Sequence, residues 1–152
     1  MPRSIVLRLA DIRDAIVGIQ NAAVGADFDA FANDWTMQRA VERGLEIMSE
    51  ASRHIPDDLK ALAPDIPWRQ IAAIGNLLRH ENQRADIKAT WNIIEEHLPP
   101  VATAIGQLIV EAAKRELWEN PAPETLSALR GVLLEAEMLL EAQGERKREP
   151  VS

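Results

Sequence analysis

The sequence predicts an all-α protein, an antiparallel bundle of about five helices. Along most of the 152 residues, apolar side chains recur at steps of three and four, the period of one helix face. No segment alternates apolar and polar residues as a strand would. Glycine and proline interrupt the helical pattern at several points and divide the chain into segments of helical length.

The first two helices are predicted in the N-terminal third. The first buries a stripe made of Ile5, Leu9, Ile12, Ile16 and Ile19. Gly25-Ala-Asp27 ends it, and the Phe28/Phe31 pair predicts a short turn packed onto the core. Thr36 is the predicted N-cap of the second helix. That helix buries Val41, Leu45, Met48 and Ile55, and its other stripe is Arg39, Arg43, Glu46, Glu50 and Arg53.

Three prolines separate the second helix from the third. Pro56, Pro64 and Pro67 bracket a loop with one short helical turn, and Pro67 suits the first turn of the third helix. The apolar positions of the third helix are Ile71, Ile74, Leu77 and Leu78.

Asp86 could cap a fourth helix, whose apolar residues have heptad-like spacing: Trp91, Ile94, Leu98, Val101, Ile105 and Leu108. At Pro99-Pro100, either this helix kinks or one helix ends and another begins at Pro99.

The C-terminal part is predicted as one more amphipathic helix. Asn120-Pro-Ala-Pro123 is a break, and the helix then runs from Thr125 to Gln143. It places Leu126, Leu129, Leu133 and Leu140 inward, and Gly144 ends it. The predicted organisation is therefore a helical domain over residues 1–120, an additional C-terminal helix over 121–143 and a flexible tail over 144–152.

Composition excludes several kinds of site. The chain has no cysteine, which rules out disulfides and thiolate metal ligands. His54, His80 and His97 lack metal-ligand spacing, so no metal and no cofactor are expected. The four tryptophans lie within or beside apolar stripes and are expected to anchor the core or an interface. The charged N-terminus and the absence of a long apolar run predict a cytoplasmic location without membrane contact.

Charge is distributed unevenly along the chain. The net charge of −7 argues against a surface that binds nucleic acid as a whole. Residues 67–90 nevertheless carry four basic and two acidic side chains, whereas residues 124–143 carry four acidic side chains and one basic one. A local site for an anion is therefore most compatible with the third helix.

The third helix ends in the stretch AIGNLLRHENQRAD, which begins at residue 73. Asn76, Arg79 and His80 are spaced i, i+3 and i+4, so they share one helix face. Histidine transfers protons near neutral pH, and guanidinium binds phosphate. RNA cleavage through the 2′-hydroxyl needs such a pair, a base for the hydroxyl proton and a cation for the phosphorane charge. The alternative interpretation is a polar helix edge with a half-exposed histidine.

Three stretches carry a resemblance to a known family. They are ADIRDAI from residue 10, TMQRAVERGLEIMSEASRHIP from residue 36 and PDIPWRQIAAIGNLLRHENQRADIKATWNIIEEHLPP from residue 64. Together they span about residues 8–100 in order, and over this span the chain resembles the HepT-like branch of the HEPN superfamily. These are small all-α proteins that include toxin ribonucleases. The resemblance implies a HEPN-like bundle, with the last helix as an addition.

The resemblance also implies a ribonuclease motif of Arg, four residues, His, one residue and Tyr. His80 falls on the motif histidine, and Asn76 on the asparagine that usually follows the arginine. Gly75 stands at the arginine position and Asn82 at the tyrosine position, and the chain contains no tyrosine. In members with an active toxin, the Arg and His act together, and an MNT-type nucleotidyltransferase antitoxin modifies the Tyr with AMP.

Arg79 is the predicted replacement for the motif arginine. It shares a face with His80, whereas position 75 is about 140° around the helix from that histidine at 100° per residue. Because dimeric members of the family bring two motif helices together, an arginine could also act across a homodimer interface. Arg43, Glu46 and Glu50 lie on a helix that could flank the site, although a solvated ion-pair stripe explains them as well.

Two functions are therefore predicted. The first is a metal-independent ribonuclease, the toxin of a toxin–antitoxin pair with an MNT-type nucleotidyltransferase, in which His80, Arg79 and Asn76 are the catalytic residues. The alternative is a catalytically inactive HEPN-fold interaction protein that keeps the homodimer and a groove for a partner or RNA. Gly75 and Asn82 favour the second function, and the retained His80 favours the first.

Overall fold

The computed structural model describes residues 4–80 and 87–146, without the side chains of residues 76–80, 139 and 143–146. Over this part of the chain the protein is helical and has no strand, which confirms the predicted all-α class. The helices in chain order are α1 (Ile5–Ala22), α2 (Phe28–Ala32), α3 (Trp35–Ser52), α4 (Asp57–Lys60), α5 (Trp68–His80), α6 (Ile87–Asn92), a π-helical segment η1 (Ile93–His97), α7 (Leu98–Glu119) and α8 (Pro123–Arg146).

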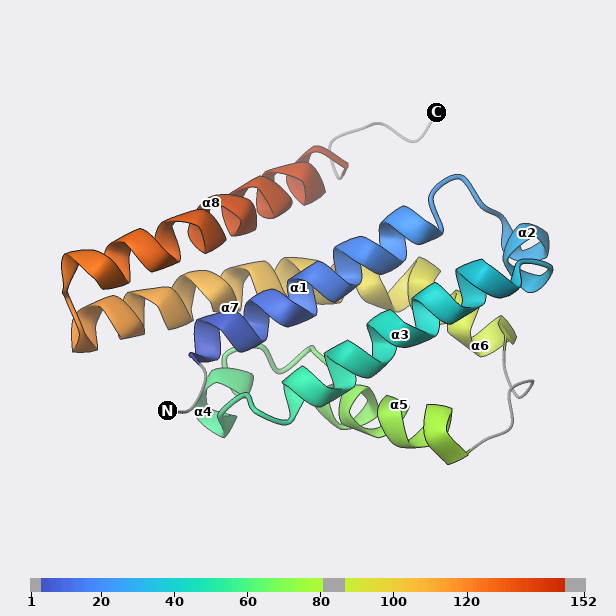
Figure 1. Ribbon diagram of the computed structural model, residues 1–152, viewed down its shortest axis with the longest axis horizontal. Coiled ribbons are helices and arrows are strands. Elements are labelled where there is room, and N and C mark those ends of the chain that lie inside the picture. Colours follow the sequence, from blue (N-terminus) through green and yellow to red (C-terminus); the bar gives the residue numbers. More distant parts are fainter. Residues whose placement is uncertain (1–3, 81–86, 147–152) are drawn as a thin grey trace.

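The longer helices form an antiparallel bundle (Figure 1). α1 lies between α3 and α7, α5 packs on the far side of α3, and α8 packs along α7 (Figure 1). Each of these four neighbouring pairs runs in opposite directions. The short helices α2 and α6 lie together at one end of the bundle, and α4 lies at the other (Figure 1).

The core is centred on α1. Its predicted stripe is buried at Leu9, Ile12, Ile16 and Ile19, as are the predicted residues Val41, Leu45 and Met48 of α3. The two helices approach closely at Gly44, where an added Cβ would collide with the side chain of Ile19. At the α2–α6 end, Phe31 packs against Trp91 with 5.3 Å between ring centroids. The apolar period of the sequence therefore identifies the buried faces correctly in this half of the bundle.

The tryptophans divide into two groups. Trp91 is a core residue and Trp68 is half-buried, as expected for anchors. Trp35 and Trp118 are 69% and 88% exposed, so these two rings do not anchor the core.

The structure corrects one predicted helix start and shows where a helix begins near Pro99-Pro100. α3 is capped by Asp34, whose Oδ1 accepts a hydrogen bond from the Met37 amide at 2.9 Å, and the predicted cap Thr36 already lies inside the helix. A carboxylate one residue before the first helical residue satisfies an otherwise unpaired amide, so it sets the start. At Pro99-Pro100 the sequence predicted either a kink or the start of a new helix. Helix α7 begins at Leu98, directly after η1. The two prolines lie in its first turn, where their missing amides cost little.

The C-terminal helix is longer than predicted and buries a narrower stripe. α8 continues to Arg146, so the predicted stop at Gly144 is wrong. Mid-helix glycine costs only about 1 kcal/mol, and the surrounding glutamate, glutamine and arginine favour helix. Leu129 and Ala136 are buried, Leu133 and Leu140 are half-buried, and Leu126 is exposed, which corrects its predicted inward position.

α8 is joined to α1 by a buried arginine. The side chain of Arg13 is 6% exposed and lies 2.7 Å from a carboxylate oxygen of Glu135. Its Nη1 donates to the Val132 carbonyl at 3.3 Å, and its Nη2 and Nε donate to Asp14. The additional helix is therefore packed onto the bundle by both apolar and charged contacts. In the described part of the chain, no helix is both long and apolar enough to cross a bilayer.

Candidate functional site

The motif residues lie at the end of α5. Because this helix is continuous from Trp68 to His80, the predicted i, i+3, i+4 register of Asn76, Arg79 and His80 falls within regular helix. The side chains of these three residues lie outside the described part of the structure, as does Asn82 altogether. Their predicted contacts therefore stay predictions.

The start of α5 is fixed by its first residues. The indole Nε1 of Trp68 donates to the Ala63 carbonyl at 3.2 Å, and the ammonium of Lys60 lies 5.7 Å from the centre of the indole ring. Ile71, one turn later, is buried in the core. These contacts hold the amino end of the helix against the loop after α4, and the motif lies at the opposite, carboxyl end.

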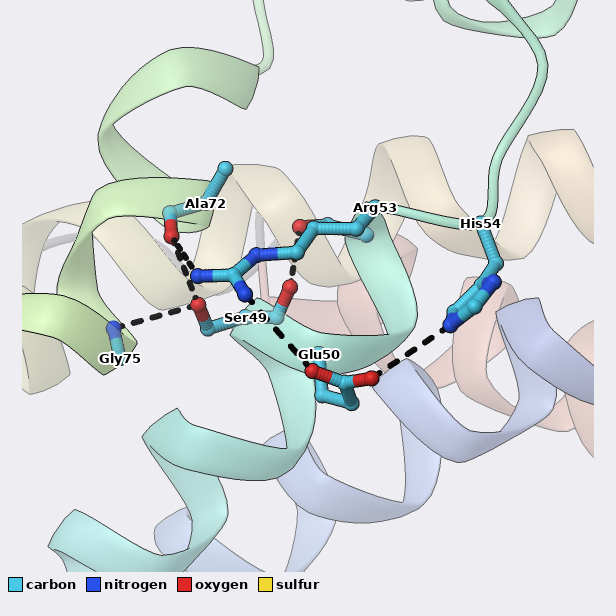
Figure 2. Close-up of polar contacts among 7 residues, drawn as sticks. Ser49, Glu50, Arg53, His54, Ala72 and Gly75 are labelled. Carbon is cyan, nitrogen blue, oxygen red and sulfur yellow. Dashed lines mark hydrogen bonds and ion pairs between the residues drawn. The ribbon is translucent and has the colours of Figure 1, made fainter.

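One serine joins α3 to the middle of α5. Ser49 is 1% exposed, and its hydroxyl donates to the Ala72 carbonyl at 2.9 Å. The same oxygen accepts from the Gly75 amide at 3.1 Å, as Figure 2 shows. A single hydroxyl thus bridges two backbone groups one turn apart on α5. Gly75, the residue at the motif arginine position, is buried in this seam between the two helices.

Next to this contact between α3 and α5, on the solvent side, lies a polar cluster of Glu50, Arg53 and His54. Arg53 Nη2 donates to the same Ala72 carbonyl at 3.0 Å, while its Nη1 lies 3.8 Å from a carboxylate oxygen of Glu50. The other Glu50 oxygen lies 3.5 Å from Nε2 of His54, and all three side chains come from the end of α3 and the turn after it (Figure 2). The side chains of Arg53, His54 and Glu50 are 37%, 44% and 64% exposed, so the cluster is open to a solute.

The supporting residues predicted on α3 separate into two groups. Glu50 belongs to the cluster beside α5. Arg43 and Glu46 form a surface ion pair at 3.2 Å, with 71% and 39% of their side chains exposed, which agrees with a solvated stripe.

Sequence analysis placed Arg53 in that solvated stripe and missed its contact with α5. The signal available was its spacing of four residues from Ser49, which puts both on one face of α3.

The described residues contain no group of three His, Asp or Glu side chains that could hold a metal ion. The chemically useful groups near α5 are instead a guanidinium, an imidazole and a carboxylate. A guanidinium can bind a phosphate, and an imidazole can transfer a proton.

The bundle defines the class of protein, a small all-α protein. The chain belongs to the HepT-like family: the sequence model described as "Ribonuclease HepT-like" matches residues 12–108. The match includes α3, α5 and the seam between them, and α8 lies outside it.

Two relatives illustrate the family. "Probable ribonuclease HepT" of Thermococcus cleftensis is 39% identical over 99 residues, which cover 65% of this chain and 90% of the relative. "Putative RNase MJ1380" of Methanocaldococcus jannaschii is 30% identical over 99 residues, covering 65% of this chain and 91% of the relative. No solved structure matches the chain.

Proposed function

We propose that this protein cleaves RNA and is the toxin component of a toxin–antitoxin system. The observation that carries the proposal is His80, which occupies the position of the motif histidine in a chain that belongs to a ribonuclease family. The helical register supports Asn76 as its partner, because the two residues are four positions apart on one face of α5. Arg79 is the adjacent residue, about 100° around the helix from His80.

In the proposed reaction, His80 accepts the proton of a ribose 2′-hydroxyl. The 2′-oxygen attacks the neighbouring phosphorus, and the bond from phosphorus to the 5′-oxygen breaks as that oxygen takes up a proton. The products are a 2′,3′-cyclic phosphate and a 5′-hydroxyl. Arg79 stabilises the negative charge that develops on the phosphorane, and Asn76 orients the imidazole. No step requires a metal ion.

The proposed partner is an MNT-type nucleotidyltransferase, which cannot act here in the usual way. The chain has no tyrosine, so transfer of AMP to a phenol is chemically impossible. We therefore expect the antitoxin to bind and occlude the site, or to modify a serine or threonine instead. Mass spectrometry of the co-expressed pair distinguishes these: an added AMP on a hydroxyl of this chain would contradict occlusion.

A homodimer in the cytoplasm completes the proposal. Two copies would bring their α5 helices together, so that an arginine of one subunit could reach the histidine of the other.

The alternative is an interaction protein that has lost catalysis. It is favoured by the departures at Gly75 and Asn82 and by the burial of Gly75 in the α3–α5 seam. Such a protein would keep the dimer and bind a partner or RNA without cleaving it.

Growth after induced expression tests the proposal. Wild-type protein should arrest growth and degrade cellular RNA, and His80→Ala should do neither. His97→Ala is the matched control, because His97 is an exposed histidine on η1 and should leave the wild-type effect unchanged. Equal growth and intact RNA with wild type and His80→Ala, at matched expression, would favour the interaction protein.

A further inference from the structure

We propose that Arg53, the residue directly after α3, supplies a phosphate-binding cation that Gly75 cannot supply from α5. The proposal rests on the proposed function, since it assigns a residue to the same site. It adds to the proposed site a second guanidinium, which comes from the C-cap of a different helix and lies outside the family motif.

The first step is position. Arg53 Nη2 donates to the Ala72 carbonyl, and Ala72 lies three residues before Gly75 on α5. The hydroxyl of Ser49 contacts both of these residues, at the Ala72 carbonyl and at the Gly75 amide (Figure 2). The Arg53 guanidinium is therefore held on α5 within about one helical turn of the backbone that carries the motif arginine in the family.

The second step is why the guanidinium can come so close. A glycine at position 75 is buried where α3 and α5 meet, and its amide is only 3.1 Å from a side-chain oxygen of α3. A residue without a side chain allows this approach of the two helices. The absence of a side chain at position 75 is thus compatible with the close packing in which Arg53 reaches Ala72.

The third step is availability for binding. A guanidinium has five N–H donors and stays charged at any physiological pH. The Ala72 carbonyl takes one donor and carries no formal charge, so it does not neutralise the cation. The contact with Glu50, at 3.8 Å, is too long for a hydrogen bond, and that carboxylate is 64% exposed. With 37% of its side chain exposed, Arg53 can present its remaining donors to a phosphate.

The test compares RNA binding and cleavage by wild type, Arg53→Met and Arg53→Lys. The probe is a fluorescently labelled single-stranded RNA, followed by anisotropy across a salt titration and by single-turnover cleavage. Arg53→Met keeps the aliphatic stem but should reduce the salt slope by about 0.7, the value for one phosphate contact to a single strand. It should also slow cleavage on the order of a hundredfold, and Arg53→Lys should recover part of both. Arg130→Met removes an exposed arginine of α8 and should match wild type.

Glu50→Gln provides a test that does not disturb Arg53. Removing the carboxylate beside the guanidinium should strengthen RNA binding at low salt, even if Arg53→Met does not fold. Two results together would overturn the role of Arg53. One is RNA binding by Glu50→Gln that equals wild type, and the other, where Arg53→Met folds, is an unchanged salt slope of binding and an unchanged cleavage rate in that variant. These results would leave the proposed ribonuclease activity intact. A wild type that binds RNA without cutting it would contradict the proposed function alone, because the salt slopes still decide Arg53. Absence of both binding and cleavage in folded wild type would overturn both.

Discussion

At the residue scale, the stability of the site depends on Ser49. Its hydroxyl contacts both Ala72 and Gly75, and the residue is 1% exposed. This buried hydroxyl makes a hydrogen bond both as donor and as acceptor. Its removal leaves the Ala72 carbonyl and the Gly75 amide with one hydrogen-bond partner fewer each.

Ser49→Ala should therefore lower the free energy of unfolding by roughly 1–3 kcal/mol. Ser127→Ala, at an exposed position of α8, should change it by less than about 0.5 kcal/mol. Urea unfolding of the two variants measures the difference. Equal stability of Ser49→Ala and wild type would mean that the hydroxyl does not join α3 to α5.

Gly75→Arg restores the motif arginine but places a long side chain in a buried seam. We expect it to cost about 1–3 kcal/mol of stability, because an added side chain at a packed position forces its neighbours apart. Gly131→Arg is the control, since nothing lies within 4 Å of a Cβ added there. A Gly75→Arg protein that is as stable as Gly131→Arg and cleaves RNA faster than wild type would instead support a decayed motif that Arg79 fills poorly.

Asp58 gives a prediction for pH. The guanidinium of Arg115 donates a hydrogen bond to this carboxylate and lowers the pKa of Asp58 below its ordinary value of 3.8. A lowered pKa in the folded state means that any stabilisation is present above the ordinary value and is lost as the pH falls through the folded value. In an NMR titration, Arg115→Ala should raise the Asp58 pKa toward 3.8. An unchanged titration would show that the pair does not form in solution.

At the element scale, periodicity predicted the helices and most of their buried faces, but not how the helices meet. The stripe of α1 was predictable because that helix has neighbours on two sides and buries a wide face. Leu126 was placed wrongly because α8 packs mainly along α7 and buries only a narrow stripe. The cap at Asp34 was within reach of sequence analysis, since Asp caps as well as Thr does, and the two differ by only two positions.

The candidate site was predictable only in part. The motif positions on α5 follow from spacing within one helix, and they fall on regular helix as predicted. The contacts of Ser49 and Arg53 with Ala72 join residues about twenty positions apart and depend on how α3 and α5 pack. Helical periodicity carries no information about that pairing, so it assigned Arg53 to solvent.

Arg13 tests how α8 is held. Its buried guanidinium contacts Val132 and Glu135 of α8. Arg13→Ala should therefore lower the free energy of unfolding by roughly 1.5–3 kcal/mol, the range for hydrogen bonds to a charged group. Glu135→Gln should cost less, because the Glu135 side chain is 62% exposed and Arg13 keeps Asp14 as a partner. Chemical denaturation gives both values. A larger loss in Glu135→Gln than in Arg13→Ala would contradict this account of the contact.

At the scale of the whole molecule, the proposal includes a homodimer. α8 leaves Leu126, Leu134 and Met138 exposed, and the interface is expected to come from α5 and from this helix. Light scattering at micromolar concentration should give twice the mass of one chain. If arginine and histidine act across the interface, mixing His80→Ala with Arg79→Ala should restore part of the cleavage that each variant lacks. A monomer of undiminished activity would remove the cross-subunit site.

Cleavage of a DNA oligonucleotide that contains one ribonucleotide tests the central claim most directly, because the proposed chemistry needs a single 2′-hydroxyl. Purified wild type should cut after that ribonucleotide and leave a 2′,3′-cyclic phosphate, identified by mass spectrometry, in the presence of a metal chelator. The all-deoxy strand should stay intact, and His80→Ala should cut neither while keeping the helix content of wild type. Cleavage by His80→Ala at the wild-type rate, cutting of the all-deoxy strand, or no cleavage by wild type at any pH tested would contradict the account.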